Sequence, residues 1–119
     1  YYHRTGFFPI MHMVVLRRDV YEQHRWVANA LLVAFEEAKA FARRRFQETG
    51  VLSVSLPWLP AHLEETNDIF GTDPFRYGFE ANRPILEAMT QYLVEQGLAQ
   101  RKLDPAELFA PETLATRVG

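Results

Sequence analysis

Ile10-Met11-His12-Met13-Val14-Val15-Leu16 is an apolar run with a single histidine, and it decides the fold class that the sequence predicts. Side chains of a β-strand alternate between its two faces, so every second residue of the run lies on the same side. Apart from His12, both faces would then be apolar. A strand that is apolar on both faces is typical of a mainly parallel sheet, which helices cover on each side. The run therefore predicts a buried strand near residues 10–16 of an α/β protein.

A polar, turn-rich segment precedes this strand. Residues 1–9 read YYHRTGFFP and bring tyrosine, histidine, arginine and threonine together around a glycine and a proline. Segments of this kind, leading into a buried strand, commonly carry the ligand-handling residues of α/β proteins. The candidate functional residues are Tyr2, His3, Arg4 and Thr5, with His12 on the strand itself.

The rest of the chain predicts helices. Capping residues and helical periodicity predict a short helix from Asp19 to Gln23 and a long helix over 26–48 that stops at Gly50. A third helix is predicted from residue 60 or 61 to Phe70, closed by Gly71, and a fourth from Asn82 to Gly97. Single helical turns are predicted at Asp104-Pro105 and at Pro111. The long helix carries one apolar stripe, which we expect to face the core: Val27, Leu31, Ala34, Phe35, Ala38, Phe41 and Ala42. The expected buried face of the helix after Asn82 comprises Ile85, Met89, Tyr92 and Leu93.

Composition excludes several classes of protein. The net charge of the 119 residues is −2, so no basic excess is available for a nucleic-acid-binding surface. The absence of cysteine excludes disulfides and thiolate metal sites. No apolar run approaches the ~20 residues that a membrane-spanning helix needs. A single strand is too little sheet for a complete α/β domain, so we expect residues 1–119 to form the C-terminal part of a larger protein.

Several strings of the sequence resemble the bacterial 4,5-dihydroxyphthalate decarboxylase family. They cover nearly the whole chain and comprise Tyr1 through Arg18 (YYHRTGFFPIMHMVVLRR), Asp19-Val20-Tyr21-Glu22, Leu56-Pro57-Trp58-Leu59-Pro60, Tyr77-Gly78 with Asn82-Arg83, and the run from Leu103 to Leu114. The resemblance implies the C-terminal part of a bilobal, type II periplasmic-binding-protein-like fold, in which residues 10–16 form a crossover strand. It implies further that residues 1–119 are a single C-terminal domain and that the N-terminal two-thirds of the parent protein is absent. It also implies a cytoplasmic carboxy-lyase that decarboxylates a hydroxylated aromatic diacid, with this chain inactive by itself.

Decarboxylation of an aromatic diacid requires cationic donors for its carboxylates and a proton for the ring carbon that loses CO₂. Arg4 suits the clamping of a carboxylate, with Thr5 adding a donor, and His12 suits proton donation, with His3 assisting. Tyr2 suits stacking on the ring or donating to its hydroxyls. A small aromatic carboxylate is therefore the expected ligand.

Each of these assignments has a structural alternative. His12 also fits a core or hinge histidine, Arg4 a surface ion pair, and Tyr2 an apolar packing role. The three arginines at 43–45 fit a solvated helix end better than an anion site. No metal site is evident and the cofactor is unknown, because a divalent metal would need ligands from outside the chain. The alternative function is a periplasmic solute-binding protein of a transporter, which uses the same fold without chemistry. In both cases we expect the chain alone to self-associate through exposed apolar surface, without membrane insertion.

Overall fold

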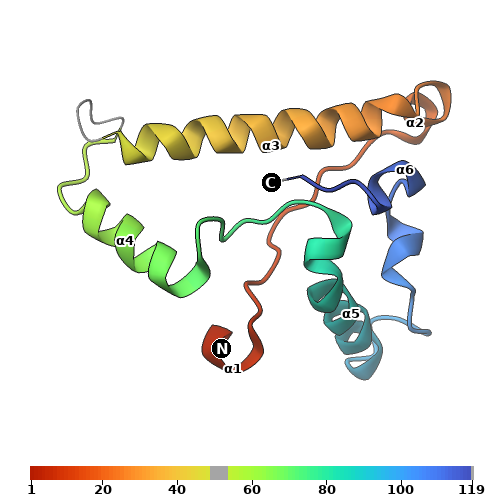
Figure 1. Cartoon of the computed structure of the whole chain (residues 1–119). Coiled ribbons are helices and arrows are strands. Elements are labelled where there is room, and N and C mark those ends of the chain that lie inside the picture. The colour runs from red at the N-terminus through yellow and green to blue at the C-terminus, as the bar shows by residue number, and fades with distance from the viewer. Residues whose placement is uncertain (49–53, 119) are drawn as a thin grey trace.

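The computed structural model describes residues 1–48 and 54–118, and these form helices joined by extended segments (Figure 1). The elements are α1 (Tyr2–Thr5), α2 (Arg18–Gln23), α3 (Trp26–Gln47), α4 (Leu59–Phe70), α5 (Phe79–Glu95), the 3-10 turn η1 (Pro105–Leu108) and α6 (Pro111–Leu114). The long helix α3 runs along one edge of the molecule and contacts α2, α4 and α6, while α5 contacts η1 and α6. No described helix is long and apolar enough to cross a membrane.

The predicted strand at residues 10–16 is wrong for this chain. The segment has no regular secondary structure, and no strand forms anywhere in ranges 1–48 and 54–118. A strand exists through hydrogen bonds to a neighbour, and no described backbone group bonds to residues 10–16. The side chains of Met11 and Val15 are 72% and 86% exposed, so the segment is not buried on two faces either. The prediction of a helix-dominated chain is confirmed, and the α/β sheet is not present within it.

Several predicted helix ends lie within two residues of the observed ones, although α2 begins at Arg18, so that Asp19 lies inside this helix and does not cap it. Helix α3 ends at Gln47, one residue before the predicted end, and Gly50 lies outside the described residues. Gly71 follows α4 with a φ of 75°, which is accessible to glycine without steric cost. Asp104 caps η1, since its side chain accepts from the Ala106 N–H at 3.0 Å.

Asn82 does not cap α5, contrary to the prediction. The helix begins earlier, at Phe79, and Asn82 lies within it. The Asn82 side-chain amide instead donates to the carbonyl oxygens of Arg76 at 2.8 Å and Gly78 at 2.9 Å, which fastens the preceding loop to the helix. Pro84 also lies inside the helix rather than at its start.

Most of the apolar stripe predicted for α3 faces solvent, although Val27 and Leu31 at its N-terminal end are half-buried. Phe35 and Phe41 are 43% and 56% exposed, and Ala34, Ala38 and Ala42 are exposed as well. The less exposed side of α3 instead carries Ala28, Asn29, Leu32, Glu36, Lys39, Ala40 and Arg43. At 100° per residue these two sets lie on nearly opposite sides of the helix. Several polar members of the second set pair with distant segments, so polar contacts decide which side of α3 faces inward.

The hydrophobic core is small and centres on α5. Phe79 and Leu86 are 3% and 2% exposed, and the hydroxyl-bearing Thr90 is buried beside them. The ring of Phe79 lies 5.3 Å from that of Phe109, which follows η1. The expected buried positions Met89 and Tyr92 are 39% and 48% exposed, so that part of the prediction is wrong. The helix is therefore turned so that Phe79, Leu86 and Thr90 face η1 and α6.

Substitution in α5 distinguishes the observed buried face from the one predicted from periodicity. We expect Leu86→Ala to lower the free energy of unfolding by about 2–4 kcal/mol, because it removes buried methyl groups and leaves a cavity. Met89→Ala, in the same helix but exposed, should cost less than about 1 kcal/mol. Urea unfolding followed by circular dichroism measures both. Equal losses for the two variants would contradict the observed orientation of α5.

Candidate functional site

Helix α1 gathers four of the predicted site residues into one helical turn. Thr5 closes this turn, because its hydroxyl donates to the Tyr1 carbonyl at 3.1 Å and accepts from the Phe7 N–H at 3.1 Å. Gly6 follows with a left-handed φ of 68° and ends the helix. His3 and Arg4 are exposed, and the Arg4 side chain, unlike its backbone N–H, makes no hydrogen bond or ion pair within the described ranges. The guanidinium of Arg4 is thus available to a ligand.

A cluster of aromatic rings holds α1 against the end of α4. The Tyr2 ring centroid lies 4.6 Å from that of Phe70, and the Phe8 ring lies 5.1 Å from Phe70. Phe8 also contacts Phe75, in the loop after α4, at 5.3 Å in an edge-to-face arrangement. Ring pairs at these separations add about 0.5–1.5 kcal/mol each beyond the area they bury. One side of α1 is therefore fixed by packing, while His3 and Arg4 remain exposed.

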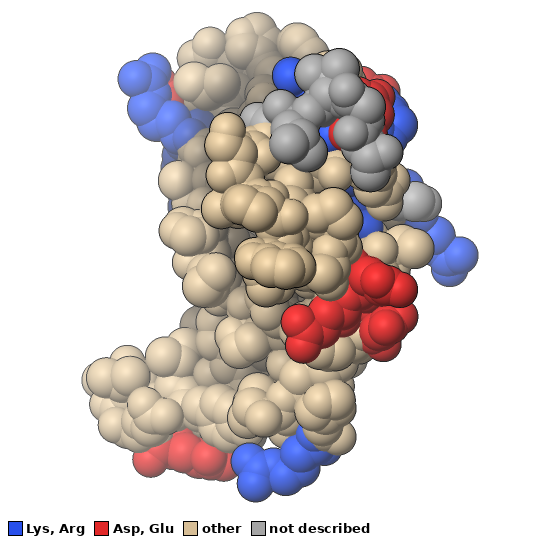
Figure 2. Space-filling view, turned by 90° about the vertical axis from the view of Figure 1, so that its left-hand side faces the viewer, with Lys and Arg blue, Asp and Glu red and all other residues tan. Residues whose placement is uncertain are grey.

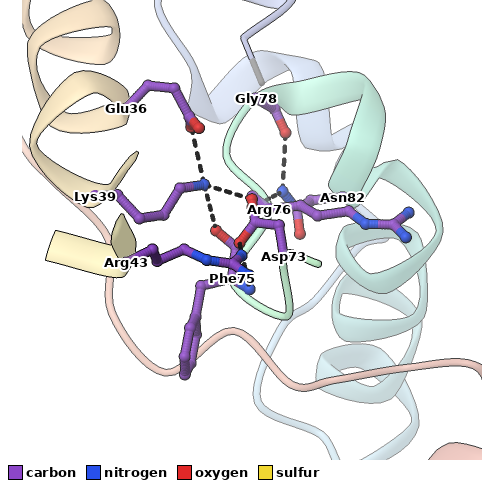
Figure 3. Close-up of polar contacts among 8 residues, drawn as sticks. All are labelled: Glu36, Lys39, Arg43, Asp73, Phe75, Arg76, Gly78 and Asn82. Carbon is purple, nitrogen blue, oxygen red and sulfur yellow. Dashed lines mark hydrogen bonds and ion pairs between the residues drawn. The ribbon is translucent and has the colours of Figure 1, made fainter. Parts of the chain in front are cut away.

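An ion cluster connects α3 to the same loop (Figure 3). The ammonium group of Lys39 lies 2.6 Å from Asp73 Oδ2, 3.0 Å from the Phe75 carbonyl oxygen and 2.9 Å from Glu36 Oε2. The same ammonium lies 4.2 Å from the centroid of the Tyr77 ring, within cation–π range. Only 11% of the Lys39 side chain is exposed, so solvent screens these contacts less than it screens surface pairs.

Asp73 is the second centre of this ion cluster. Its Oδ1 lies 3.2 Å from Arg43 Nη1 and accepts from the Phe75 N–H at 3.1 Å, while its Oδ2 pairs with Lys39. Burial by itself raises the pKa of Asp73, but hydrogen bonds from Lys39 and Arg43 outweigh burial and bring the pKa below its usual value of 3.8. Asp73 is therefore ionised at neutral pH and fixes the loop by charge.

Phe75 joins the ring cluster to the ion cluster. Its ring contacts Phe8, its carbonyl accepts from Lys39 and its N–H donates to Asp73. An open hollow lies beside the ion cluster, and its lining comprises Glu36, Lys39, Ala40, Arg43, Arg44, Gln47, Thr72 and Asp73. The acidic members pair with Lys39 and Arg43, so this arrangement holds structure together and does not leave a free acid or base.

His12 stands apart from the α1 residues. It lies on the extended segment, is exposed, and has no described hydrogen bond or ion pair that joins it to His3 or Arg4. The structure thus brings Tyr2, His3, Arg4 and Thr5 together and leaves His12 outside their group. Within the described ranges, no three His, Asp or Glu side chains gather closely enough to hold a metal ion.

Sequence reasoning missed the ion cluster and placed Arg43 in a solvated helix end. Glu36, Lys39 and Arg43 follow one another at intervals of three and four residues, a spacing that already places them on one side of α3. Their partner Asp73 gives no comparable signal, because it lies in a loop 34 residues beyond Lys39.

Comparison with known proteins identifies one curated relative of this chain. The sequence is 38% identical over 114 residues to a 4,5-dihydroxyphthalate decarboxylase of Comamonas testosteroni. The match covers 96% of this chain and 34% of that protein, so the chain spans about a third of the length of the curated relative. No family model matches the sequence. The family resemblance that the sequence strings predict is confirmed.

Removal of the Asp73 charge should loosen the loop after α4. We expect Asp73→Asn to lower the free energy of unfolding at neutral pH by about 1–2 kcal/mol, between the values for exposed and buried ion pairs. The lowered pKa means that the Asp73 carboxyl group binds its proton less tightly in the native state than in the unfolded chain. The stabilisation is therefore complete above the usual pKa and is lost as the pH falls through the lowered one.

Urea unfolding midpoints between about pH 3 and pH 7 measure this effect. The variant should show a flatter profile than the unaltered protein at the acidic end. Asp68→Asn, which alters an exposed acid on α4, is the matched control and should leave the profile unchanged. An acidic profile of Asp73→Asn that coincides with that of the unaltered protein would contradict the assignment.

Proposed function

We propose that this chain, a homologue of one third of a 4,5-dihydroxyphthalate decarboxylase, forms one wall of the substrate site in an enzyme that decarboxylates a hydroxylated aromatic diacid. The observation that carries the proposal is the 38% identity over 96% of the chain. An identity at this level over 114 residues supports a shared reaction class, and the substrate of this protein is inferred from the name of the relative.

The exposed side of α1 provides groups suited to binding an aromatic carboxylate. The guanidinium of Arg4 can donate two parallel N–H hydrogen bonds to the oxygens of a carboxylate, in a bidentate arrangement. The ring cluster beneath it holds α1 in place through Tyr2, so that Arg4 is presented from a fixed turn. The Thr5 hydroxyl already makes two hydrogen bonds within the turn, so the role that we propose for Thr5 is limited to positioning the helix. Tyr2 is half-buried against Phe70 and can offer only its free edge or hydroxyl to a ligand.

The proposed chemistry needs a proton at the carbon that loses CO₂. Cleavage of the carbon–carbon bond leaves its electron pair on the ring carbon, and a proton from a general acid completes the product. His12 is the proposed donor and His3 the proposed assistant, since an imidazolium can supply a proton near neutral pH. Because His12 lies on an extended segment without hydrogen-bonded neighbours, we propose that other parts of the enzyme fix its position.

For the chain alone we propose no activity. His3, Arg4 and His12 are all exposed, so none of residues 1–48 and 54–118 excludes water from a substrate bound to them. We also propose that the site takes its remaining walls, and any cofactor, from outside these 119 residues.

A chimaera tests the proposed function directly. The 114 matched residues of the Comamonas enzyme are replaced by those of this chain, and CO₂ release from 4,5-dihydroxyphthalate is measured. We expect turnover by the chimaera and none by the chain alone. His12→Ala should lower kcat by about 10²–10⁴-fold, the range for loss of a general acid. Arg4→Ala should raise KM by about tenfold or more, through loss of a charge-assisted pair.

Matched controls separate these effects from general damage. His62→Ala and Arg18→Ala alter exposed residues of α4 and α2 and should leave kcat and KM unchanged. Full turnover in both site variants would overturn the site assignment while leaving the reaction in place. Binding of the diacid by a folded chimaera without CO₂ release would favour the alternative of a solute-binding protein.

The isolated chain should self-associate. Large apolar side chains such as Met11, Val15 and Phe41 are more than half exposed, and apolar surface on this scale promotes association. We expect light scattering to report a dimer or larger species whose proportion rises with protein concentration. A monomer that binds no hydrophobic dye would contradict this expectation.

A further inference from the structure

The chain exposes more surface than its mass requires. Its accessible surface is 9220 Å², whereas a compact monomer of 13.8 kDa exposes about 6,600 Å². The radius of gyration is 17.2 Å, against about 13.5 Å for a compact domain of this length. The difference of about 2,600 Å² exceeds the ~800 Å² that each partner buries in an interface of standard size. An excess this large is characteristic of a chain that is completed by an extensive contact with other protein.

The solvent-facing side of α3 is the best-defined part of this excess. We use the name α3 stripe for Leu31, Ala34, Phe35, Ala38, Phe41 and Ala42, of which Leu31 is half-buried and the other five are exposed. Phe35 and Phe41 are 43% and 56% exposed, and the small alanine side chains beside them let another backbone approach closely. The stripe extends about 16 Å along the helix. A separate view, from the side on which α4 and the C-terminal end of α3 lie, shows a continuous area of uncharged residues between charged groups (Figure 2).

Rotation of α3 cannot bury this stripe within the chain. Lys39 on the opposite side is held by Asp73 and Phe75, and Asn29 accepts a hydrogen bond from Thr116 at 2.8 Å. A half-turn of α3 would break these contacts and place an ammonium and a guanidinium in solvent on the other side. The polar contacts of Lys39 and Asn29 on the inward side of α3 thus keep the stripe on the opposite, solvent-facing side, where a partner can cover it.

We propose that the α3 stripe packs against the part of the decarboxylase polypeptide that has no counterpart in this chain. The proposal rests on the proposed function, through the relationship to the Comamonas enzyme. The chain spans 34% of that protein, so about two-thirds of the relative's length remains to supply the partner surface. That much polypeptide can readily provide a contact of the size of the excess surface. The expected contact is apolar, with Phe35 and Phe41 as its anchors.

Thiol accessibility in the chimaera tests the proposal, because the chain itself has no cysteine. Ala38→Cys places a thiol in the middle of the stripe, and Leu98→Cys, at a side chain 71% exposed after α5, is the matched control. Mass spectrometry follows the labelling of each position. In the chimaera we expect the thiol introduced by Ala38→Cys to react at least about tenfold more slowly than the control thiol, because the core of a contact excludes water. In the monomeric fraction of the isolated chain the two should react alike.

A charge-insertion variant provides a second measurement. Phe41→Glu alters an exposed side chain, so the isolated chain should keep its helical circular dichroism. In the chimaera it should lower the thermal unfolding midpoint, because a carboxylate would be buried without a partner. Leu98→Glu should leave that midpoint unchanged.

Three outcomes separate this inference from the proposed function. Equal labelling of the two thiols in a chimaera that releases CO₂ would overturn the contact and leave the function standing. Protection of the stripe in a chimaera without activity would support the contact and count against the function. Protection only in the self-associated isolated chain would assign the stripe to a second copy, and the proposed partner would be wrong.

Discussion

The contacts of the Lys39 ammonium group constrain most of the arrangement of this chain. Lys39 lies near the middle of α3, yet its ammonium donates hydrogen bonds to a carboxylate and a carbonyl of the loop after α4, besides its ion pair with Glu36 on α3 itself. That loop carries Phe75, whose ring contacts Phe8 and through it the segment that leads from α1. One ammonium group therefore links the long helix, the loop and the N-terminal segment. Its effect is large because only 11% of the side chain is exposed.

The same contacts explain why the most apolar side of α3 faces solvent. Glu36, Lys39 and Arg43 occupy the inward side and are paired there, and a helix cannot present two opposite sides to one neighbour. Burial of Phe35 and Phe41 would require a surface outside the described parts of the chain. The small core around Phe79 and Leu86 agrees with this picture, since only a few side chains are fully withdrawn from water. The outward stripe and the proposed substrate site therefore lead to the same proposal, namely that further polypeptide contacts this chain on both surfaces.

The candidate site was predictable in part. Tyr2, His3, Arg4 and Thr5 were identified from residue type alone, and their consecutive positions placed them together in any local structure. Their arrangement as a helical turn was not predicted, because Gly6 and Pro9 favoured a loop. His12 was assigned to a strand, for which the described part of the chain provides no hydrogen-bonding neighbour. The apolar pattern of residues 10–16 was real, but a pattern cannot form a strand without a neighbour.

By itself, the sequence determined where the longer helices lie in the chain. Helices begin and end in response to local signals, namely hydrophobic periodicity, prolines and glycines such as Gly71 and Gly97, which act over only a few residues. It also determined the family resemblance, which the identity to the Comamonas enzyme confirms. Only the tertiary structure decided which side of each helix is buried. That choice depends on contacts between residues far apart in the chain, such as Lys39 with Asp73 and Asn29 with Thr116. Hydrophobic periodicity cannot predict which side is buried, because burial of an apolar stripe requires a surface that faces it. On α3, the ion pairs of the charged side chains determine which side faces inward.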